Sequence, residues 1–220
     1  MQKNNLKPRY SYFLIGFGLL FLTEPLLSVL QADFPAASLL FILIMIVAFS
    51  ASGILNIRHR ASLFAVGLAI FGLVIEYLNN SRFLHMESGT LTLMIHGIYA
   101  YFIVHSIVVL TVRIFSEKSI DLDALSGGIF IYFLIGILWV ALYRILLQVN
   151  PEAFNVNAKD SLFYFSYTTL TTLGYGDIYP KSQYARILCN AEAIAGQIFL
   201  AVFIARLVGL YIVQEITKEK

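Results

Sequence analysis

One short polar string in this sequence has the residue types to bind a cation through its backbone. It lies between two long apolar segments and reads Thr171-Thr172-Leu173-Gly174-Tyr175-Gly176-Asp177. Irregular backbone at membrane depth is tolerated only where it is buried in protein or lines a water-filled path. A string of this kind between apolar segments therefore indicates a buried loop or one that lines such a path.

The two glycines of the string suit a loop whose carbonyl oxygens replace the water shell of a dehydrated cation. Successive carbonyls of a regular strand point in opposite directions. They point the same way only if alternate residues take left-handed dihedral angles, which glycine adopts without a steric penalty. Gly174 and Gly176 have this spacing. Four copies of such a loop around one axis can supply rings of carbonyl ligands.

The string resembles the selectivity-filter signature of potassium channels, which usually reads Thr-Val-Gly-Tyr-Gly-Asp, with Leu173 at the Val position. The resemblance covers about residues 125–215 and is to tetrameric channels of the bacterial type, with six-helix subunits and a two-helix pore module. It implies an ion-binding filter at residues 172–177, which includes Gly176, and Asp177 closes it at the outer mouth. The implied potassium ligands are the carbonyls of Thr172, Leu173, Gly174 and Tyr175 and the Thr172 hydroxyl. It implies no cofactor apart from the permeant K⁺ ions.

An ordinary exposed turn is the alternative interpretation of Gly-Tyr-Gly-Asp. The surroundings of the string favour the filter, because a Thr run and a short helical segment precede it. Asp160 or Ser161 can cap that short helix with a side-chain oxygen.

The composition predicts an all-α integral membrane protein. The chain has 220 residues, of which 59% are hydrophobic and 13% charged, against about 25% charged in soluble domains. A membrane helix needs about 20 residues, and six segments reach that length: 10–30, 36–55, 61–78, 90–114, 124–148 and 184–213. A cleaved signal peptide is the alternative interpretation of the first segment, but no clear cleavage site follows it.

Other function classes find little support in the composition and motifs. The net charge of +2 gives no reason to expect a nucleic-acid partner. The single cysteine, Cys189, excludes an intrachain disulfide, and the four histidines lack metal-ligand spacing. Because no nucleotide-binding or hydrolase motif occurs, we expect no enzyme.

We expect two parts in the chain. Residues 1–115 form a four-helix membrane domain, and residues 116–220 form a pore domain. The pore domain is expected to contain an outer helix at 124–148, a pore helix at 161–171, the filter at 172–177 and an inner helix at 184–213. Since the chain has one filter string and a carbonyl ring needs four, we expect a homotetramer.

Lysine and arginine residues near the segment ends predict the orientation in the bilayer. Their distribution places both termini in the cytoplasm and the segment 149–183 on the outer side, from which the filter loop re-enters. We expect a multi-pass protein of a plasma membrane, with a bacterial inner membrane as first choice. Few residues follow the last helix, so we expect any soluble regulator to be a separate protein.

Several residues are expected to support the filter and the inner pore. Tyr164 and Phe165 stand where many potassium channels have two tryptophans, and Thr168 stands where some have a carboxylate; Thr171 ends the pore helix. Gly196 is either a hinge or a packing glycine of the inner helix. Ala201, and Ala205 beyond it, could line the inner pore.

Ionisable residues inside membrane segments are candidates for function. Glu24, Glu76 and His96 come to similar depth, as an external pH sensor or as a structural polar cluster. Glu192 either tunes the field of the pore or its gating, or it forms an ion pair or hydrogen bond to a neighbouring helix, such as with Arg186 or Arg144.

The fourth segment lacks the repeated arginines of voltage-sensing helices, since its first arginine is Arg113 at the cytoplasmic end. We therefore expect weak voltage dependence and selective, passive potassium conduction. The alternatives are a non-selective cation channel, a potassium transporter subunit and a non-conducting sensor or scaffold.

Overall fold

The structure is a computed structural model that describes residues 60–80, 89–116, 122–156 and 161–218. All regular elements in this part of the chain are helices: α3 (Arg60–Asn80), α4 (Gly89–Ser116), α5 (Leu122–Val149), α6 (Leu162–Leu170) and α7 (Gln183–Lys218). The expected helices at 10–30 and 36–55 lie outside the described residues, and so does Glu24 in the first of them.

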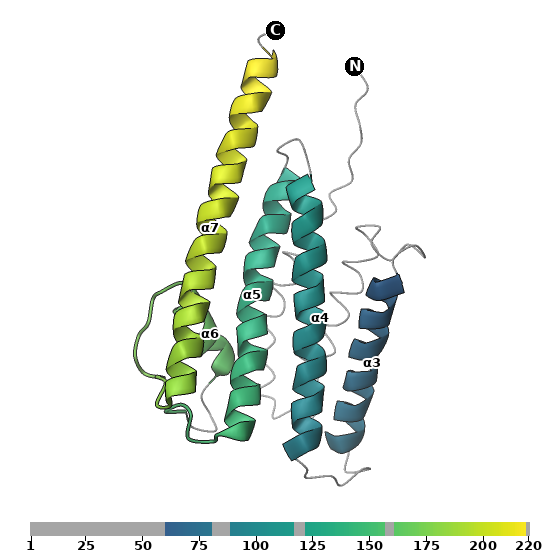
Figure 1. Ribbon diagram of the computed structural model, residues 1–220, viewed down its shortest axis with the longest axis vertical. Coiled ribbons are helices and arrows are strands. Elements are labelled where there is room, and N and C mark those ends of the chain that lie inside the picture. Colours follow the sequence, from purple (N-terminus) through teal and green to yellow (C-terminus); the bar gives the residue numbers. More distant parts are fainter. Residues whose placement is uncertain (1–59, 81–88, 117–121, 157–160, 219–220) are drawn as a thin grey trace, which may run out of the picture.

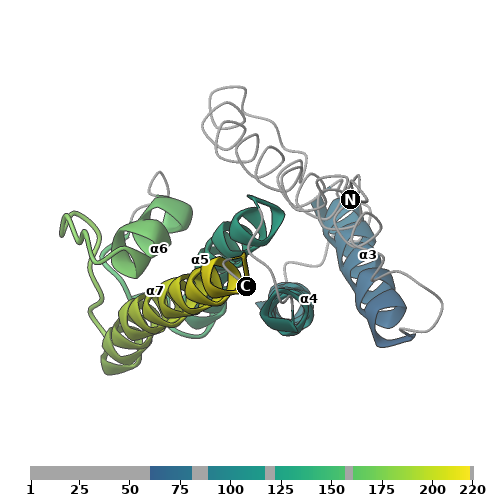
Figure 2. The same cartoon turned by 90° about the horizontal axis from the view of Figure 1, so that it is seen from above.

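The long helices run roughly along one axis, and the short helix α6 lies beside two of them. Figure 1 shows α3, α4 and α5 side by side, with α7 leaning across the far side of α5. Seen from above, α3 and α6 lie at opposite ends of the molecule (Figure 2). Helix α4 packs against both α3 and α5, and α6 packs against both α5 and α7. The short helix is therefore held by the two helices that flank it in sequence.

Four of these helices, namely α3, α4, α5 and α7, are long and apolar enough to cross a membrane. With 36 residues, α7 is about 54 Å long at the usual rise per residue. It extends past the end of α5 in Figure 1. The observed bounds differ from the expected segments by at most five residues, the largest difference being at the end of α7. The division of the chain at residue 115 stays a prediction.

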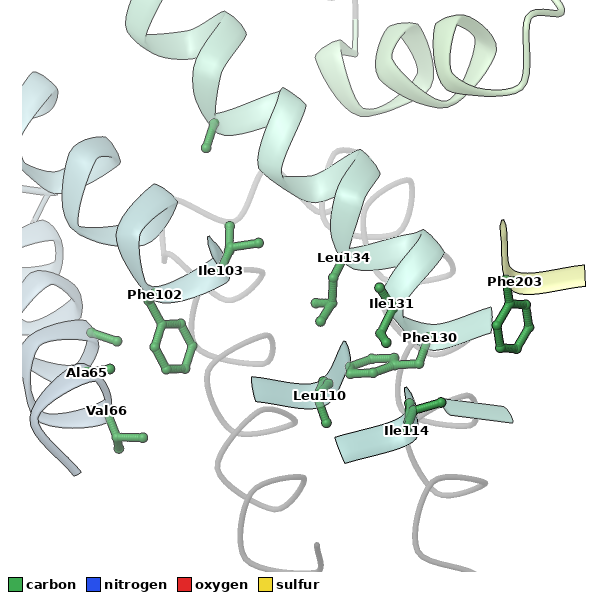
Figure 3. Close-up of a cluster of buried hydrophobic side chains, with 12 residues drawn as sticks. Ala65, Val66, Phe102, Ile103, Leu110, Ile114, Phe130, Ile131, Leu134 and Phe203 are labelled. Carbon is green, nitrogen blue, oxygen red and sulfur yellow. The ribbon is translucent and has the colours of Figure 1, made fainter. Parts of the chain in front are cut away.

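A core of buried side chains joins the N-terminal helices to the last helix. It includes residues of four helices, shown in Figure 3: Ala65, Val66, Phe102, Ile103, Leu110, Ile114, Phe130, Ile131, Leu134 and Phe203. Phe203 is the contribution of α7, and it lies beside Phe130 and Ile114 in Figure 3. Phe203 thus places α7 in the same apolar core as α4 and α5.

A second core surrounds the start of α6. The Phe154 ring lies edge-on against Tyr143 of α5 and Phe165 of α6, with ring centroids 5.1 and 5.4 Å apart. The same loop residues pair with the segment before α7, since the amide of Asn155 donates to the carbonyl of Tyr179 at 2.9 Å. The two connections that flank α6 and its following loop are therefore tied to each other.

Candidate functional site: the loop after the short helix

The short helix begins with a side-chain cap. The Ser161 hydroxyl accepts a hydrogen bond from the amide of Tyr164 at 3.3 Å. This satisfies one of the amide donors that lack a partner in the first turn of a helix. The expected cap at Ser161 is confirmed, whereas Asp160 lies outside the described residues. Helix α6 ends at Leu170, one residue before the expected Thr171.

The loop that follows is attached to the last turn of α6. The carbonyl of Thr168 accepts hydrogen bonds from the amides of Leu173 at 2.8 Å and Gly174 at 3.0 Å. The amide of Thr172 donates to the carbonyl of Thr169 at 2.9 Å. The Thr168 hydroxyl donates to the carbonyl of Phe165 within its own helix at 2.9 Å. The support that this residue gives to the loop comes therefore from its backbone rather than its side chain.

The backbone of the loop alternates as its glycine spacing predicts. The φ angle is +54° at Gly174 and +81° at Gly176. Thr172 continues the pattern towards α6 with a φ of +59°, which the sequence alone does not reveal. A positive φ is unusual for a β-branched residue, and the hydrogen bonds at the end of α6 hold it there. Left-handed residues at every second position turn the carbonyls between them to a common side.

The C-terminus of α6 and the far end of the loop both carry negative charge. The C-terminus of a helix has partial negative charge from its unpaired carbonyls, and the loop starts at that end of α6. At the far end of the loop, the Tyr164 hydroxyl donates to Oδ2 of Asp177 at 2.8 Å. This hydrogen bond lowers the pKa of Asp177 and raises the pKa of Tyr164 to about 12. Asp177 is therefore a carboxylate at neutral pH.

The two aromatic residues expected around the loop have separate surroundings. The Tyr164 ring stacks on Tyr175 at a centroid distance of 6.2 Å. Phe165 is buried on the other side of α6, where it contacts Tyr143 and Phe154. Tyr164 thus contacts the loop itself, and Phe165 anchors the helix behind it.

Glycine allows the three helices around the loop to approach one another closely. A Cβ atom at Gly196 of α7 would lie 2.6 Å from the carbonyl oxygen of Leu170, the last residue of α6. A Cβ atom at Gly136 of α5 would lie 2.6 Å from the Tyr167 ring. The close packing of α7 against α6 thus explains a glycine at position 196. A role of Gly196 as a hinge stays a prediction. Ala201 is exposed on α7 in the single chain.

Glu192 of α7 is fully buried between three helices. The Tyr143 hydroxyl hydrogen bonds to its Oε2 atom, and Ser166 Oγ lies 2.5 Å from its Oε1 atom. The expected hydrogen bond to a neighbouring helix is confirmed. The suggested partners Arg186 and Arg144 are wrong: the Arg144 side chain is exposed, and Arg186 Nε donates to the carbonyl of Pro180 at 3.5 Å. Six residues correspond to about 240° around a helix, so Arg186 points away from Glu192.

The other expected polar residues find local partners. The Tyr99 hydroxyl donates to Glu76 at 2.5 Å, and His96 Nδ1 donates to the carbonyl of Thr92 at 2.8 Å. Glu192 bonds elsewhere, so it is not part of one cluster with them. A pH-sensing role of Glu76 and His96 stays a prediction.

Ser166 and Tyr143 are site residues that sequence reasoning missed. A carboxyl group inside an apolar span requires polar partners. The hydroxyl residues of the neighbouring helices were the signal, but the sequence holds many of them and does not say which face Glu192.

Comparison with known proteins agrees with this geometry. A family model described as "Ion channel" matches residues 128–212. Two pore potassium channel a of Oryza sativa subsp. japonica is 32% identical over 103 residues, which are 47% of this chain and 28% of that protein. Voltage-gated potassium channel regulatory subunit KCNF1 of Rattus norvegicus is 29% identical over 100 residues, 46% of this chain and 19% of that protein. No solved structure matches the chain significantly.

The chain thus spans less than a third of the length of either relative. The matched region contains α6, the loop at 172–177 and most of α5 and α7. Residues 128–212 are therefore similar in sequence to a family of ion channels, and the chain is similar to potassium channel proteins over about half of its length.

Proposed function

We propose that the protein is a potassium-selective channel that conducts K⁺ passively across a plasma membrane, with a bacterial inner membrane as first choice. The backbone of the loop carries this proposal, because φ is positive at Thr172, Gly174 and Gly176. The carbonyls of residues 172–175 and the Thr172 hydroxyl are the proposed ligands. They replace the water shell of the ion, as backbone carbonyls do in potassium-selective filters.

A homotetramer completes the proposed site. In the single chain, residues 172–177 are exposed, with 57% of Leu173 and 68% of Tyr175 accessible. Large apolar side chains are also exposed along α7, among them Ile194, Ile198 and Val202. One loop presents its carbonyls from one side only, so an ion is surrounded when four loops face a common axis. In this arrangement both termini are cytoplasmic and the loop enters from the outer face.

Flux into liposomes tests the proposed function. The purified full chain is reconstituted, and the entry of K⁺ or Tl⁺ is compared with the entry of Na⁺. We expect flux of K⁺ and Tl⁺ that greatly exceeds the flux of Na⁺. Equal permeability to both ions would instead indicate a non-selective cation channel, and saturable transport with a turnover far below channel rates would indicate a transporter subunit.

Two loop variants link the flux to the proposed ligands. Gly174→Ala places a Cβ atom on a residue with a φ of +54°, which is strained for an L-residue by about 1–2 kcal/mol. Tyr175→Ala removes the ring that stacks on Tyr164. Both should lose selectivity or flux and still insert into membranes. Gly97→Ala on α4 is the matched control, because its added Cβ meets no atom within 4 Å.

A regulatory subunit is the second candidate function. It is favoured by the similarity to a protein named as a voltage-gated potassium channel regulatory subunit. On this alternative, the purified chain alone carries no flux, but its co-expression changes the current of a second channel protein. Selective flux through the purified chain alone would exclude this alternative.

A further inference from the structure

Glu192 is a buried ionisable group that the proposed conduction pathway does not use. Its side chain has no exposed surface. Among the described residues, the titratable groups that interact electrostatically with Glu192 are Tyr143 and Tyr132 of α5 and Cys189 of α7. Helix α6 contributes the Ser166 hydroxyl. None of the described cationic side chains pairs with Glu192, so a negative charge there would lack a compensating cation among the described residues.

The number of hydrogens in this cluster depends on the state of Glu192. Ser166 Oγ lies between two acceptors, 2.5 Å from Glu192 Oε1 and 2.9 Å from the carbonyl oxygen of Gly136. A serine hydroxyl has one hydrogen to donate. If Glu192 were a carboxylate, this one hydrogen would have to serve both acceptors. One of the two close oxygen–oxygen approaches would then lack a hydrogen.

A proton on Oε1 of Glu192 satisfies the contacts that join Glu192, Ser166, Gly136 and Tyr143. The carboxylic acid then donates to Ser166 Oγ, and the Ser166 hydroxyl donates to the carbonyl of Gly136. The Tyr143 hydroxyl donates to the remaining oxygen, Oε2. Each contact has one hydrogen, and no charge is buried.

We propose that Glu192 is a neutral carboxylic acid and that, in this form, it is a positioning residue that joins α7 to α6 and α5. The positioning part rests on the proposed channel function. The path to the loop is short, because Ser166 lies two residues before Thr168, whose carbonyl holds the amides of Leu173 and Gly174. The close contact of Gly196 with Leu170 fixes the same two helices one turn further along α7.

Infrared spectroscopy of the purified full chain tests the protonation state. The spectrum of Glu192→Gln is subtracted from that of the wild type at neutral pH. We expect a carbonyl stretching band of a protonated carboxylic acid in the difference spectrum, and a shift of this band in D₂O. A carboxylate band in its place would overturn the proposal.

Variants in liposomes test the positioning role. An amide, like a carboxylic acid, has one oxygen that accepts and a group that donates, so Glu192→Gln should keep the preference for K⁺ over Na⁺. Glu192→Leu has similar bulk without hydrogen bonds and should lose it. If Glu192→Leu does not fold, Ser166→Ala replaces it, since this change removes the link from α6 alone. Unchanged selectivity in the variant tested would overturn the positioning role.

The two kinds of failure are distinguishable. Absence of selective flux in the wild type counts against the proposed channel function. The infrared band, and a lower melting temperature of Glu192→Leu than of Glu192→Gln, require no conduction. They therefore test the neutral, hydrogen-bonded state of Glu192 in either case.

Discussion

The Tyr164 hydroxyl donates a hydrogen bond to Oδ2 of Asp177 at 2.8 Å, across a separation of 13 residues. Tyr164 lies in the first turn of α6, and Asp177 lies at the far end of the loop. At the near end of the loop, two amides donate hydrogen bonds to the carbonyl of Thr168 in the last turn of α6. The same short helix therefore holds both ends of the loop, and its position sets the spacing of the carbonyls between them.

Removing this hydrogen bond should make the loop more sensitive to acid. The bond lowers the pKa of Asp177 from its ordinary value of 3.8. The stabilisation that this hydrogen bond gives to the folded state is complete at a pH above this ordinary value. It is lost as the pH falls through the lower pKa of the folded state. In Tyr164→Phe the pKa of Asp177 rises back towards 3.8. We therefore expect potassium flux to decline at a higher external pH than in the wild type, as measured by a pH titration of the flux.

The control for this prediction is Tyr101→Phe, which removes the hydroxyl of an exposed tyrosine on α4. It should leave the acid midpoint of the flux unchanged. The prediction fails if Tyr164→Phe and the wild type share one midpoint, because the hydrogen bond to Asp177 would then contribute nothing to the conducting state.

A side chain at Gly196 should separate α7 from α6. The added Cβ of Gly196→Ala would lie 2.6 Å from the carbonyl oxygen of Leu170, and backbone cannot yield as a flexible side chain does. Overpacking of this kind costs about 1–3 kcal/mol. We expect a lower melting temperature of the purified protein together with reduced flux.

Gly209→Ala is the matched control on the same helix, because its added Cβ meets no atom within 4 Å. It should be as stable as the wild type. If Gly196→Ala also kept the stability of the wild type but changed channel opening, the glycine would act as a hinge rather than as a packing residue.

The long helices and the alternating loop could be predicted from the sequence because each depends on local features. Apolar length alone identifies α5, and the spacing of Gly174 and Gly176 predicts left-handed dihedral angles. The positive φ of Thr172 could not be predicted this way. This φ angle depends on hydrogen bonds at the end of α6. They hold Thr172, a β-branched residue, in a conformation that such residues otherwise avoid.

The surroundings of Glu192 were beyond sequence reasoning for another reason. Ser166 and Tyr143 lie 26 and 49 residues away along the chain. Their approach to Glu192 depends on how α5, α6 and α7 are rotated about their own axes. Membrane depth can be counted along a sequence, and it suggested Arg186 and Arg144 as partners. Rotation is set by packing between helices, including the glycine contacts.

The contact between Gly128 and Phe203 should behave as a coupled pair. A Cβ atom at Gly128 of α5 would overlap the Phe203 ring of α7. Gly128→Ala should therefore destabilise the protein, and Phe203→Ala should cost about 3–5 kcal/mol by leaving a cavity. Because the smaller residue makes room for the new Cβ, the double variant should lose less stability than the sum of both. Additive losses in an unfolding experiment would show that the two sites do not interact.

The last turn of α4 should lose stability when Arg206 of α7 is replaced. The Arg206 guanidinium lies 4.9 Å from the centroid of the Phe115 ring, and it donates to the carbonyl of Ile114 at 3.4 Å. A cation is favourable near a helix C-terminus, where carbonyls lack partners. Arg206→Gln should cost about 1–2 kcal/mol, measured as a lower melting temperature.

Arg206→Lys keeps the charge but not the planar group that stacks on a ring and reaches a carbonyl at once. We therefore expect the melting temperature of Arg206→Lys to lie between those of the wild type and Arg206→Gln. Arg113→Gln removes a cation from the same turn of α4 and is the control for charge alone. An equal loss in Arg113→Gln and Arg206→Gln would mean that the net charge at this end matters and that the contact between α7 and α4 does not.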